Sequence, residues 1–344
     1  MTMSTTTREI RLKSRPHGLP TPDNFDLVET TLAAPSPGQL LVRNTWMSVD
    51  PYMRGRMVDR ETYIPPFKLG EALEGAAVGV VERSNDPAFS IGDRVVHFSG
   101  WRDHAIVTAS DATRITGTDI APQTYLSALG FPGLTAYAGL MRIAEVKAGE
   151  TIFVSAASGA VGSIVAQIAK SKGLRVVASV GSADKAKWLI DEVGVDAVIN
   201  YRETPDLVAA LAQAAPEGID IYFDNVGGNH LEAALAIANV NARFVLCGMI
   251  SGYNAEQPQA GPSNIFAAIE KRIRLQGLIG ADHFDLSADF NRDMIGWLKA
   301  GQVKIRETVA DGLENAPSAF IDLFKGANHG KMLVRLTTDA ALSR

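Results

Sequence analysis

The residues with the clearest chemical potential stand in a glycine-containing turn, Ala157-Ser-Gly159-Ala-Val-Gly162. A run typical of a buried strand, residues 151–155, precedes the turn, and residues 161–172 read as a helix. Strand, glycine turn and helix in this order are typical of a dinucleotide-binding unit. A glycine lets the backbone approach a pyrophosphate, and the N–H groups at the helix start attract phosphates. The residues expected to cradle the pyrophosphate are Gly159, Ala160, Val161 and Gly162.

The end of the next predicted strand, residues 175–180, bears on which dinucleotide would bind. This strand is followed by Gly181 and Ser182 instead of Asp or Glu. An acidic residue there would bind an adenosine ribose 2′-hydroxyl and repel a 2′-phosphate. Because Ser182 and Lys185 stand near that position instead, the pattern predicts NADPH over NADH, and therefore a reductase.

The composition sets limits on the partners. The chain has 344 residues, 46% of them hydrophobic and 21% charged, which suits a globular protein of two domains. A net charge of −5 gives no electrostatic reason to bind nucleic acid or an anionic membrane. No apolar run reaches the ~18 residues of a membrane span, and the polar start resembles no signal peptide. We therefore expect a cytoplasmic protein with no nucleic-acid or membrane partner.

The metal-ligating residue types are sparse. Cys247 is the only cysteine, which excludes a disulfide within the chain and a multi-cysteine zinc site. The six histidines are scattered, without HxxxH or HExxH spacing. We expect no bound metal, and we expect Cys247, in the apolar run 244–248, to be a buried strand residue and not a nucleophile.

The pattern of secondary structure predicts two domains. Short strands punctuated by Gly and Pro before residue 125 indicate an antiparallel, barrel-like domain. From residue 125 strands and helices alternate, which predicts a doubly wound parallel sheet. The final strand, 331–336, has no helix after it and is expected to return to the first domain. The predicted strands are 39–44, 76–83, 94–98 and 105–108 in the first part, and 151–155, 175–180, 197–200, 219–224, 243–247 and 274–279 in the second.

Several longer strings resemble one protein family over nearly the whole chain. They are Met47-Ser-Val-Asp-Pro-Tyr-Met-Arg54, Tyr63-Ile-Pro-Pro-Phe-Lys-Leu-Gly-Glu71, Asp224-Asn-Val-Gly-Gly228, Cys247-Gly-Met-Ile-Ser-Gly-Tyr-Asn254, Lys271-Arg-Ile-Arg-Leu-Gln-Gly277 and Gly326-Ala-Asn-His-Gly-Lys331. Together they resemble the zinc-independent medium-chain dehydrogenases/reductases. Within them, the resemblance is to the prostaglandin reductase and alkenal double-bond reductase branch, and most to the bacterial NADPH-dependent curcumin reductases.

This resemblance implies an α/β fold with a GroES-like β-barrel domain, residues 1–124 and 314–344. It also implies a doubly wound parallel Rossmann domain that binds NADPH, residues 125–313. The zinc alcohol dehydrogenases of the superfamily carry a Gly-His-Glu string, whereas Leu69-Gly-Glu-Ala-Leu-Glu-Gly75 contains no histidine. An activated C=C bond needs less electrophilic help than a carbonyl, because the charge moves to a conjugated oxygen that hydrogen bonds can stabilise. The implied activity is NADPH-dependent reduction of α,β-unsaturated aldehydes or ketones.

The resemblance also implies roles for single residues around the cofactor. Lys185 and Tyr201 would lie beside the adenosine 2′-phosphate, and Asn225 near the ribose and nicotinamide. Cys247 and Tyr253 would pack against the cofactor, and Asn328 would close over it. Plainer interpretations exist for two of them: Tyr201 as a loop aromatic, and Asn225 as a turn residue before two glycines.

The residue that protonates the substrate stays open at this point. A tyrosine is a natural proton donor to an enolate. Resemblance favours Tyr63 as the catalytic residue, with Tyr52 as the second candidate and Tyr253 as a third, and solvent could also supply the proton. The residues expected to line the substrate pocket are Tyr52, Tyr63, Trp101 and Tyr253, although a single Trp at a strand start is most often a core residue.

Other functions remain compatible with the sequence. A quinone oxidoreductase of the same superfamily would share the nucleotide-binding half. A non-catalytic NADPH-binding sensor or structural protein would share it as well, and oxidation of an alcohol with NADP is disfavoured by the missing zinc motif. Relatives are commonly homodimers, and we expect a homodimer here. The apolar edge run 274–279 is compatible with sheet pairing between subunits.

Overall fold

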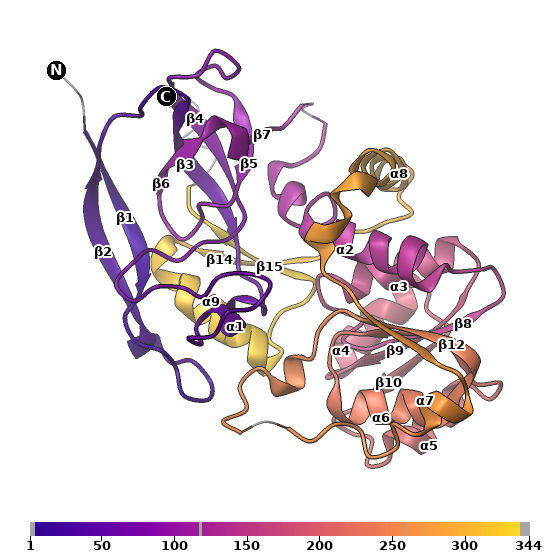
Figure 1. The fold of residues 1–344 in the computed structure, drawn as a ribbon. Coiled ribbons are helices and arrows are strands. Elements are labelled where there is room, and N and C mark those ends of the chain that lie inside the picture. The colour runs from indigo at the N-terminus through magenta and orange to yellow at the C-terminus, as the bar shows by residue number, and fades with distance from the viewer. Residues whose placement is uncertain (1–3, 117–118, 258, 338–344) are drawn as a thin grey trace. The chain divides into compact units, whose positions relative to one another are not determined.

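The computed structural model describes residues 4–116, 119–257 and 259–337, and the chain forms two compact units (Figure 1). The first unit contains the described residues up to 126 together with 307–328 and 332–337. The second unit contains 127–306, apart from residue 258, and 329–331. Among the described residues, no helix is both long enough and apolar enough to cross a bilayer.

The first unit is built on β-structure. A seven-stranded sheet has the order β14-β15-β3-β4-β5-β7, with β6 paired to β3, and β1 and β2 form a separate antiparallel pair. The strands are β1 (Thr5–Leu12), β2 (Phe25–Leu32), β3 (Gln39–Ser48), β4 (Ala77–Ser84), β5 (Arg94–His97), β6 (His104–Thr108), β7 (Thr113–Arg114), β14 (Glu307–Asp311) and β15 (Lys331–Arg335). The helices are α1 (Met53–Arg56) and α9 (Ala316–Lys325), with 3₁₀ turns at Pro22–Asn24, Ala109–Asp111, Pro122–Leu126 and Leu313–Asn315.

The long strand β3 organises this sheet, because it pairs antiparallel with β4, β6 and β15. Two register shifts along the β3–β4 pairing mark bulges, which bend a sheet and help it to curl. The predicted strands of this half correspond to β3, β4, β5 and β6. The last predicted strand, 331–336, corresponds to β15, which joins the first unit's sheet as expected.

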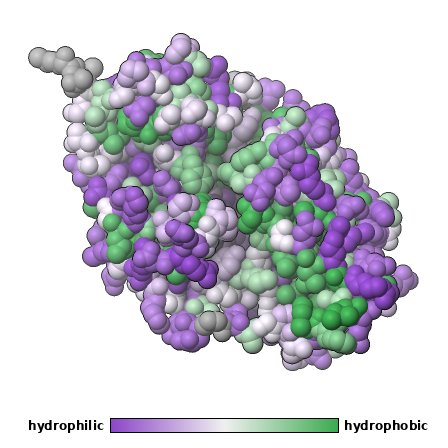
Figure 2. Space-filling model, in the orientation of Figure 1, coloured by the Kyte–Doolittle hydropathy of each residue, from purple (hydrophilic) through white to green (hydrophobic). Residues whose placement is uncertain are grey.

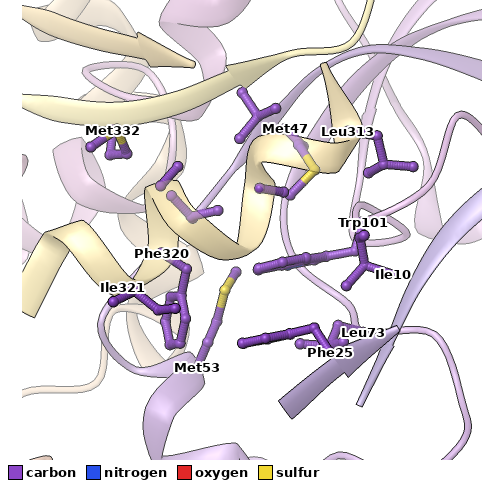
Figure 3. Packing of buried hydrophobic residues seen from close by; sticks show 14 of the residues in the cluster. Ile10, Phe25, Met47, Met53, Leu73, Trp101, Leu313, Phe320, Ile321 and Met332 are labelled. Atoms are coloured by element: carbon purple, nitrogen blue, oxygen red, sulfur yellow. The ribbon is translucent and has the colours of Figure 1, made fainter. Parts of the chain in front are cut away.

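Helix α9 covers the apolar interior of the first unit, as Figure 3 shows. Its Phe320 is fully buried and packs edge-on against the rings of Phe25 and Trp101, with centroids 6.3 and 6.1 Å apart. Phe25 and Trp101 are themselves stacked at 6.2 Å. Aromatic pairs of this geometry contribute beyond their buried area. The helix ends at Gly326, whose φ of +71° suits glycine at a helix C-terminus.

The second unit contains a six-stranded sheet in the order β10-β9-β8-β11-β12-β13, and all of its pairings are parallel. This order is that of the dinucleotide-binding fold. The strands are β8 (Thr151–Val154), β9 (Arg175–Val180), β10 (Ala197–Asn200), β11 (Ile219–Asp224), β12 (Ala238–Leu246) and β13 (Arg274–Gly277). All six predicted strands of this half are found, and the predicted α/β fold class is confirmed.

Helices connect the strands of the second unit. They are α2 (Phe131–Ala138), α3 (Gly162–Ser171), α4 (Ala183–Trp188), α5 (Leu207–Ala214), α6 (Gly228–Ile237), α7 (Ala267–Glu270) and α8 (Ser287–Lys299). Wider π-helical turns continue α2 over Gly139–Ala144 and α4 over Leu189–Val193, and 3₁₀ turns lie at Ile250–Gly252 and Gly280–Leu286. Every residue of β8 is buried, as expected for a central parallel strand covered on both faces.

The unit boundaries differ in detail from the predicted residues 124 and 314. The chain re-enters the first unit at Glu307 because β14 joins β15 in that unit's sheet. Residues 329–331 group with the second unit, although the strand that they begin continues in the first. The alternation of helix and strand along the sequence could not reveal the return at Glu307 or the grouping of residues 329–331, since both depend on pairing between segments distant in the sequence.

His97, at the end of β5, is a buried titratable group of the first unit. The Ser99 N–H donates to Nδ1 at 3.1 Å, so the ring proton is on Nε2, which donates to Asn44 Oδ1 at 2.8 Å. Burial, aided by the Arg102 charge, lowers the pKa of His97 to about 3. The neutral ring is therefore part of the folded core at neutral pH.

The first prediction concerns acid stability. Unfolded His97 binds a proton below about pH 6.5, whereas the folded ring does not until about pH 3. This group therefore leaves stability unaffected above pH ~6.5 and reduces it as the pH falls toward 3. Urea denaturation over this range should show a steeper loss of stability in the wild type than in His97→Gln, which keeps a donor for Asn44. Equal slopes in both proteins would contradict the assignment.

Candidate functional site

The glycine turn links β8 directly to α3. Ala156 adopts a left-handed conformation with φ of +47°, and the Ala157 N–H donates to Ser179 O of β9 at 3.0 Å. The Gly159 N–H donates to Ala156 O at 2.9 Å, which closes the turn. The chain thus reverses within a few residues, and α3 begins where the strand stops.

Close packing explains why glycine stands at the end of this turn. A Cβ on Gly162 would lie 2.5 Å from Ala156 O and 2.9 Å from Ala157 Cα, which no side chain tolerates. At Gly159 the distance from a Cβ to Ala156 O would be 3.2 Å, a tight but lesser constraint. The first turn of α3 holds no acidic residue, so the positive end of the helix dipole is not neutralised from within. These features would suit an anion at this turn.

The edge formed by the ends of β9 and β10 holds the residues expected at a 2′-phosphate. A Cβ on Gly181 would lie 2.8 Å from Tyr201 Oη and 3.2 Å from Arg202 Nε. Any larger residue at position 181, an acid included, would displace Tyr201. The absence of an acidic residue after β9 and the position of Tyr201 are therefore linked by packing. The side chains of Tyr201 and Arg202, which follow β10, lie over the end of β9.

Lys185 brings positive charge to the same edge. Ser182 caps α4 by accepting from the Lys185 N–H at 3.4 Å, so the lysine stands in the first turn of the helix. Only 8% of Lys185 is exposed, and burial together with the Arg202 charge lowers the pKa of its ammonium group. The buried Lys185 ammonium and the exposed Arg202 guanidinium repel one another, and a bound anion would relieve that repulsion.

His230, in the first turn of α6, is a residue that the sequence analysis missed. Its ring is buried and lies edge-on to Tyr201, with centroids 5.2 Å apart, and it stacks on Phe153 of β8. Burial lowers the pKa of His230 to about 4, so the ring is neutral at physiological pH. Its ring contact helps to hold the Tyr201 ring in place. No local sequence signal reveals this role.

Asn225 follows β11 at the carboxyl edge of the sheet and is fixed by Ser155. Its side-chain Nδ2 donates to Ser155 O at 2.8 Å, and its N–H donates to Ser155 Oγ at 2.9 Å. Beneath it the buried Asp224 carboxylate accepts from Tyr222 Oη at 2.7 Å and from two backbone N–H groups of the following turn. Burial raises the pKa of Asp224, against the effect of these hydrogen bonds. The turn that carries Asn225 is thereby rigid.

Cys247 and Tyr253 follow β12 at the same edge. The prediction of Cys247 as a buried strand residue is wrong in detail, because the strand ends at Leu246 and Cys247 is partly exposed. The Cys247 N–H donates to Asp224 O at 2.9 Å, and burial with the nearby Asp224 charge raises the pKa of the thiol to about 12. Tyr253 accepts from the Met249 N–H at 3.3 Å, and its Oη lies 3.1 Å from where a Cβ on Gly248 would be. Their predicted contacts with a cofactor stay predictions.

The segment after Asn328 contacts the glycine turn. The Gly330 N–H donates to Ser158 O at 2.8 Å, and Gly159 and Gly330 form an isolated parallel bridge. Asn328, which is half-buried, comes two residues before Gly330. Its predicted role over the cofactor stays a prediction.

The two candidate proton donors of the first unit lie in different environments. Tyr52 is mostly covered, and burial, followed by the charge of Asp50, raises the pKa of its phenol well above the ordinary value. Tyr63 is 65% exposed in the loop that follows α1. The phenol of Tyr63 also acts electrostatically on that of Tyr52, so the two residues are neighbours within the unit. Of the two, Tyr63 is the more accessible to water.

Arg56 anchors the loop that carries Tyr63, and the sequence analysis missed it. Its Nε donates to Pro65 O at 2.9 Å and its Nη2 to Glu74 Oε2 at 2.8 Å. The guanidinium lies 4.0 Å from the Phe67 ring centroid, and the Phe67 N–H donates to Arg56 O at 2.7 Å. The buried Arg56 thus holds the segment that follows Tyr63, at Pro65 and Phe67 near its start and at Glu74 further on.

The prediction that Trp101 lines the substrate pocket is wrong. Its side chain is 0% exposed and lies inside the core beneath α9, stacked on Phe25 (Figure 3). The large apolar ring is buried in the interior of the first unit, where Phe320 also packs edge-on against it. The alternative interpretation of Trp101 as a core residue is the one that the structure supports.

Comparison with known proteins places this chain in a family. A family model described as "N-terminal domain of oxidoreductase" matches residues 8–115, and one described as "Zinc-binding dehydrogenase" matches residues 160–300. The NADPH-dependent curcumin reductase of Escherichia coli is 43% identical over 95% of this chain and 96% of its own. The NADP(+)-dependent 2-alkenal reductase of Nicotiana tabacum is 41% identical over 96% and 98%.

A solved structure gives the same result in three dimensions. CurA from Vibrio vulnificus, in complex with NADPH, superposes with a TM-score of 0.91 at 41% identity, covering 96% of this chain and 99% of that one. This chain therefore belongs to the medium-chain dehydrogenase/reductase superfamily, in the branch of the curcumin, alkenal and prostaglandin reductases. It is an oxidoreductase of that branch. Among the described residues, no group of three or more His, Cys, Asp and Glu could hold a metal ion.

The second prediction concerns the single thiol. Because its pKa is about 12, Cys247 should react with iodoacetamide far more slowly than a free cysteine at neutral pH. The alkylation rate, followed by intact-mass spectrometry, should keep rising with pH up to the alkaline limit of folding. The urea-unfolded chain is the control and should react fully at about pH 8.5. Rapid alkylation of the folded protein at neutral pH would contradict the raised thiol pKa.

Proposed function

We propose that this protein is an NADPH-dependent reductase of the C=C bond in α,β-unsaturated aldehydes and ketones. NADPH, when bound, supplies the hydride that adds to the β-carbon of the substrate. A proton adds at the α-carbon, so the product is the saturated carbonyl compound. The observation that carries the proposal is the basic edge of Lys185, Tyr201 and Arg202 beside an intact glycine turn, in a chain 43% identical to a curcumin reductase.

The residues of the second unit fit a 2′-phosphorylated dinucleotide. Gly162 lets α3 start close against the backbone of Ala156, so the N-terminus of α3 faces the glycine turn. Lys185 and Arg202 would hold the 2′-phosphate, with Tyr201 kept in place by His230. Asn225, on its rigid turn, would bind toward the ribose and nicotinamide. Ser182, Cys247, Tyr253 and Asn328 complete the proposed cofactor site.

The residues of the first unit support a proton-donor role for Tyr63. A phenol exposed to water can give its proton to an enolate carbon and recover it from solvent. Burial, and then the charge of Asp50, raise the pKa of Tyr52, so its phenol is a poorer acid than an ordinary tyrosine. We propose that Tyr52 shapes the substrate pocket next to Tyr63, and that Arg56 keeps the Tyr63 loop in place.

We also propose that the protein is a homodimer that pairs through the second unit. β13 is one of the two edge strands of its sheet, β10 being the other, and an edge strand can pair with a strand of a second copy. Phe266 and Ile269, just before this strand, are 63% and 70% exposed. Figure 2 shows apolar surface gathered in the region where Figure 1 labels α7. A second copy would cover this surface.

The proposed activity is tested by mixing the protein with NADPH and a panel of enones and enals, and following the absorbance of the reduced cofactor. We expect turnover of hydrophobic enones, with the saturated carbonyl compound identified by mass spectrometry. Turnover of simple quinones without any enone would instead assign a quinone oxidoreductase. Tight NADPH binding with no acceptor turned over would support the non-catalytic alternative and contradict our proposal.

The third prediction concerns cofactor choice. Lys185→Ala should reduce kcat/KM for NADPH by about 10- to 100-fold, because one charge-assisted hydrogen bond to a phosphate is lost. The value for NADH should hardly change, since NADH carries no 2′-phosphate. Lys187→Ala is the matched control, because this exposed lysine of the same helix pairs with Asp191. A parallel loss with both cofactors would show that Lys185 does not read the 2′-phosphate.

The fourth prediction concerns proton transfer. Tyr63→Phe should lower kcat for enone reduction by about 100-fold or more, whereas NADPH affinity should stay unchanged. Arg56→Lys should lower kcat to a lesser extent, because a lysine cannot hold Pro65 and Glu74 together. Tyr52→Phe is the comparison and should mainly raise KM. If Tyr63→Phe keeps full kcat, solvent is the proton donor and the assignment of Tyr63 fails.

A further inference from the structure

The segment His329–Lys331 is pinned to the second unit from two sides. On one side, Gly330 bridges to Gly159 and donates to Ser158 O at 2.8 Å. On the other, the Lys331 N–H donates to Arg306 O at 3.0 Å. A Cβ on Gly330 would lie 1.8 Å from Arg306 O, and its φ is +67°, so glycine is required there. His329 is therefore held at a fixed place next to the glycine turn.

The side chain of Arg306 extends this arrangement to α4. Its guanidinium carbon lies 5.6 Å from the ring centroid of Trp188, at the end of that helix. Trp188 stands one turn beyond Lys185, so Arg306 brings positive charge along the helix that carries Lys185. His329, half-buried, is within electrostatic reach of Arg306 and of Lys185. Lys185, Arg306 and His329 thus bring basic groups from three separate segments of the chain.

We propose that His329, together with Arg306, forms a second arm of the phosphate-binding site and donates a hydrogen bond to a phosphate of the bound nucleotide. This inference deepens the proposed function, on which it rests. Lys185 and Arg202 form the first arm, at the ends of β9 and β10. The second arm approaches from the segment that bridges to Gly159. Phosphate oxygens are strong acceptors, and an imidazolium can donate from either ring nitrogen.

The surroundings of His329 make its protonation depend on the ligand. Burial, then the charges of Arg306 and Lys185, lower the pKa of His329, and Asp184 acts weakly in the opposite direction. Without an anion the ring is therefore neutral at neutral pH. A phosphate placed among these groups reverses the local field and favours the charged ring. Binding of the nucleotide should then take up a proton at His329, and acid should strengthen binding.

The proton uptake can be measured by titration calorimetry of the full chain with NADPH in buffers of different ionisation enthalpy. The phosphate has its own second pKa near ~6 and releases some proton when cations bind it. This contribution is common to the wild type and His329→Gln, so the difference between the two proteins isolates the ring. His283→Gln is the matched control, because this histidine lies on the 3₁₀ turn before α8, against Arg142.

We expect the wild type to take up more protons per NADPH than His329→Gln, and the control to match the wild type. His329→Gln should weaken NADPH binding roughly tenfold near pH ~6 and much less near pH ~8.5. His329→Lys carries a permanent charge and should restore affinity while removing the pH dependence. If the wild type and His329→Gln show equal proton uptake and equal affinity at both pH values, the proposal is overturned.

Two further ligands identify the phosphate. Adenosine 2′-monophosphate carries only the 2′-phosphate, and NADH carries only the pyrophosphate. A difference in proton uptake with the first assigns His329 to the 2′-phosphate, and a difference with the second assigns it to the pyrophosphate. If the wild type and His329→Gln show no difference in proton uptake with NADPH, NADH or adenosine 2′-monophosphate, the proposal is overturned. Failure of the wild type to bind NADPH at all would instead contradict the proposed function.

Discussion

The structure depends on one constraint in the second unit, the contact of Gly162 with the backbone of Ala156. This contact lets α3 begin immediately after β8, so that the start of the helix stands at the carboxyl edge of the sheet. Every other element of the nucleotide site is arranged around this point. Ser155 fixes Asn225, the Ala157 N–H ties the turn to β9, and Ser158 receives Gly330 from the end of the chain.

This geometry does not distinguish NADPH from NADH, and we propose that electrostatics makes that distinction. Gly181 has no side chain because Tyr201 occupies that space, and Tyr201 rests on the neutral ring of His230. Lys185 and Arg202 bring two cations to this edge, Arg306 lies against Trp188 of α4, and His329 precedes the bridge of Gly330 to Gly159. Holding like charges together costs free energy in the protein alone, and an anion of high charge offsets that cost. We infer that the 2′-phosphate is what this edge has been built to bind.

Local patterns revealed the parts of the molecule that local physics determines. The six parallel strands were predictable because each is a short apolar run between helical stretches, and Gly159 and Gly162 stood at a recognisable spacing. Trp101 was misassigned because an isolated aromatic carries no sign of whether it faces a ligand or the core. Arg56 and His230 were missed because their roles arise from partners distant in the sequence, Pro65 and Glu74 for one and Tyr201 for the other.

If the second unit recognises a 2′-phosphate by charge, NADPH must bind more tightly than NADH, and an equilibrium measurement of both affinities tests this. The dissociation constants of NADPH and NADH for the wild-type protein can be compared by fluorescence at low and high ionic strength. We predict that NADPH binds at least about tenfold more tightly at low salt, which corresponds to ~1.4 kcal/mol. The difference should narrow as salt screens the phosphate contacts. Equal affinities for the two nucleotides at low salt would contradict the claim.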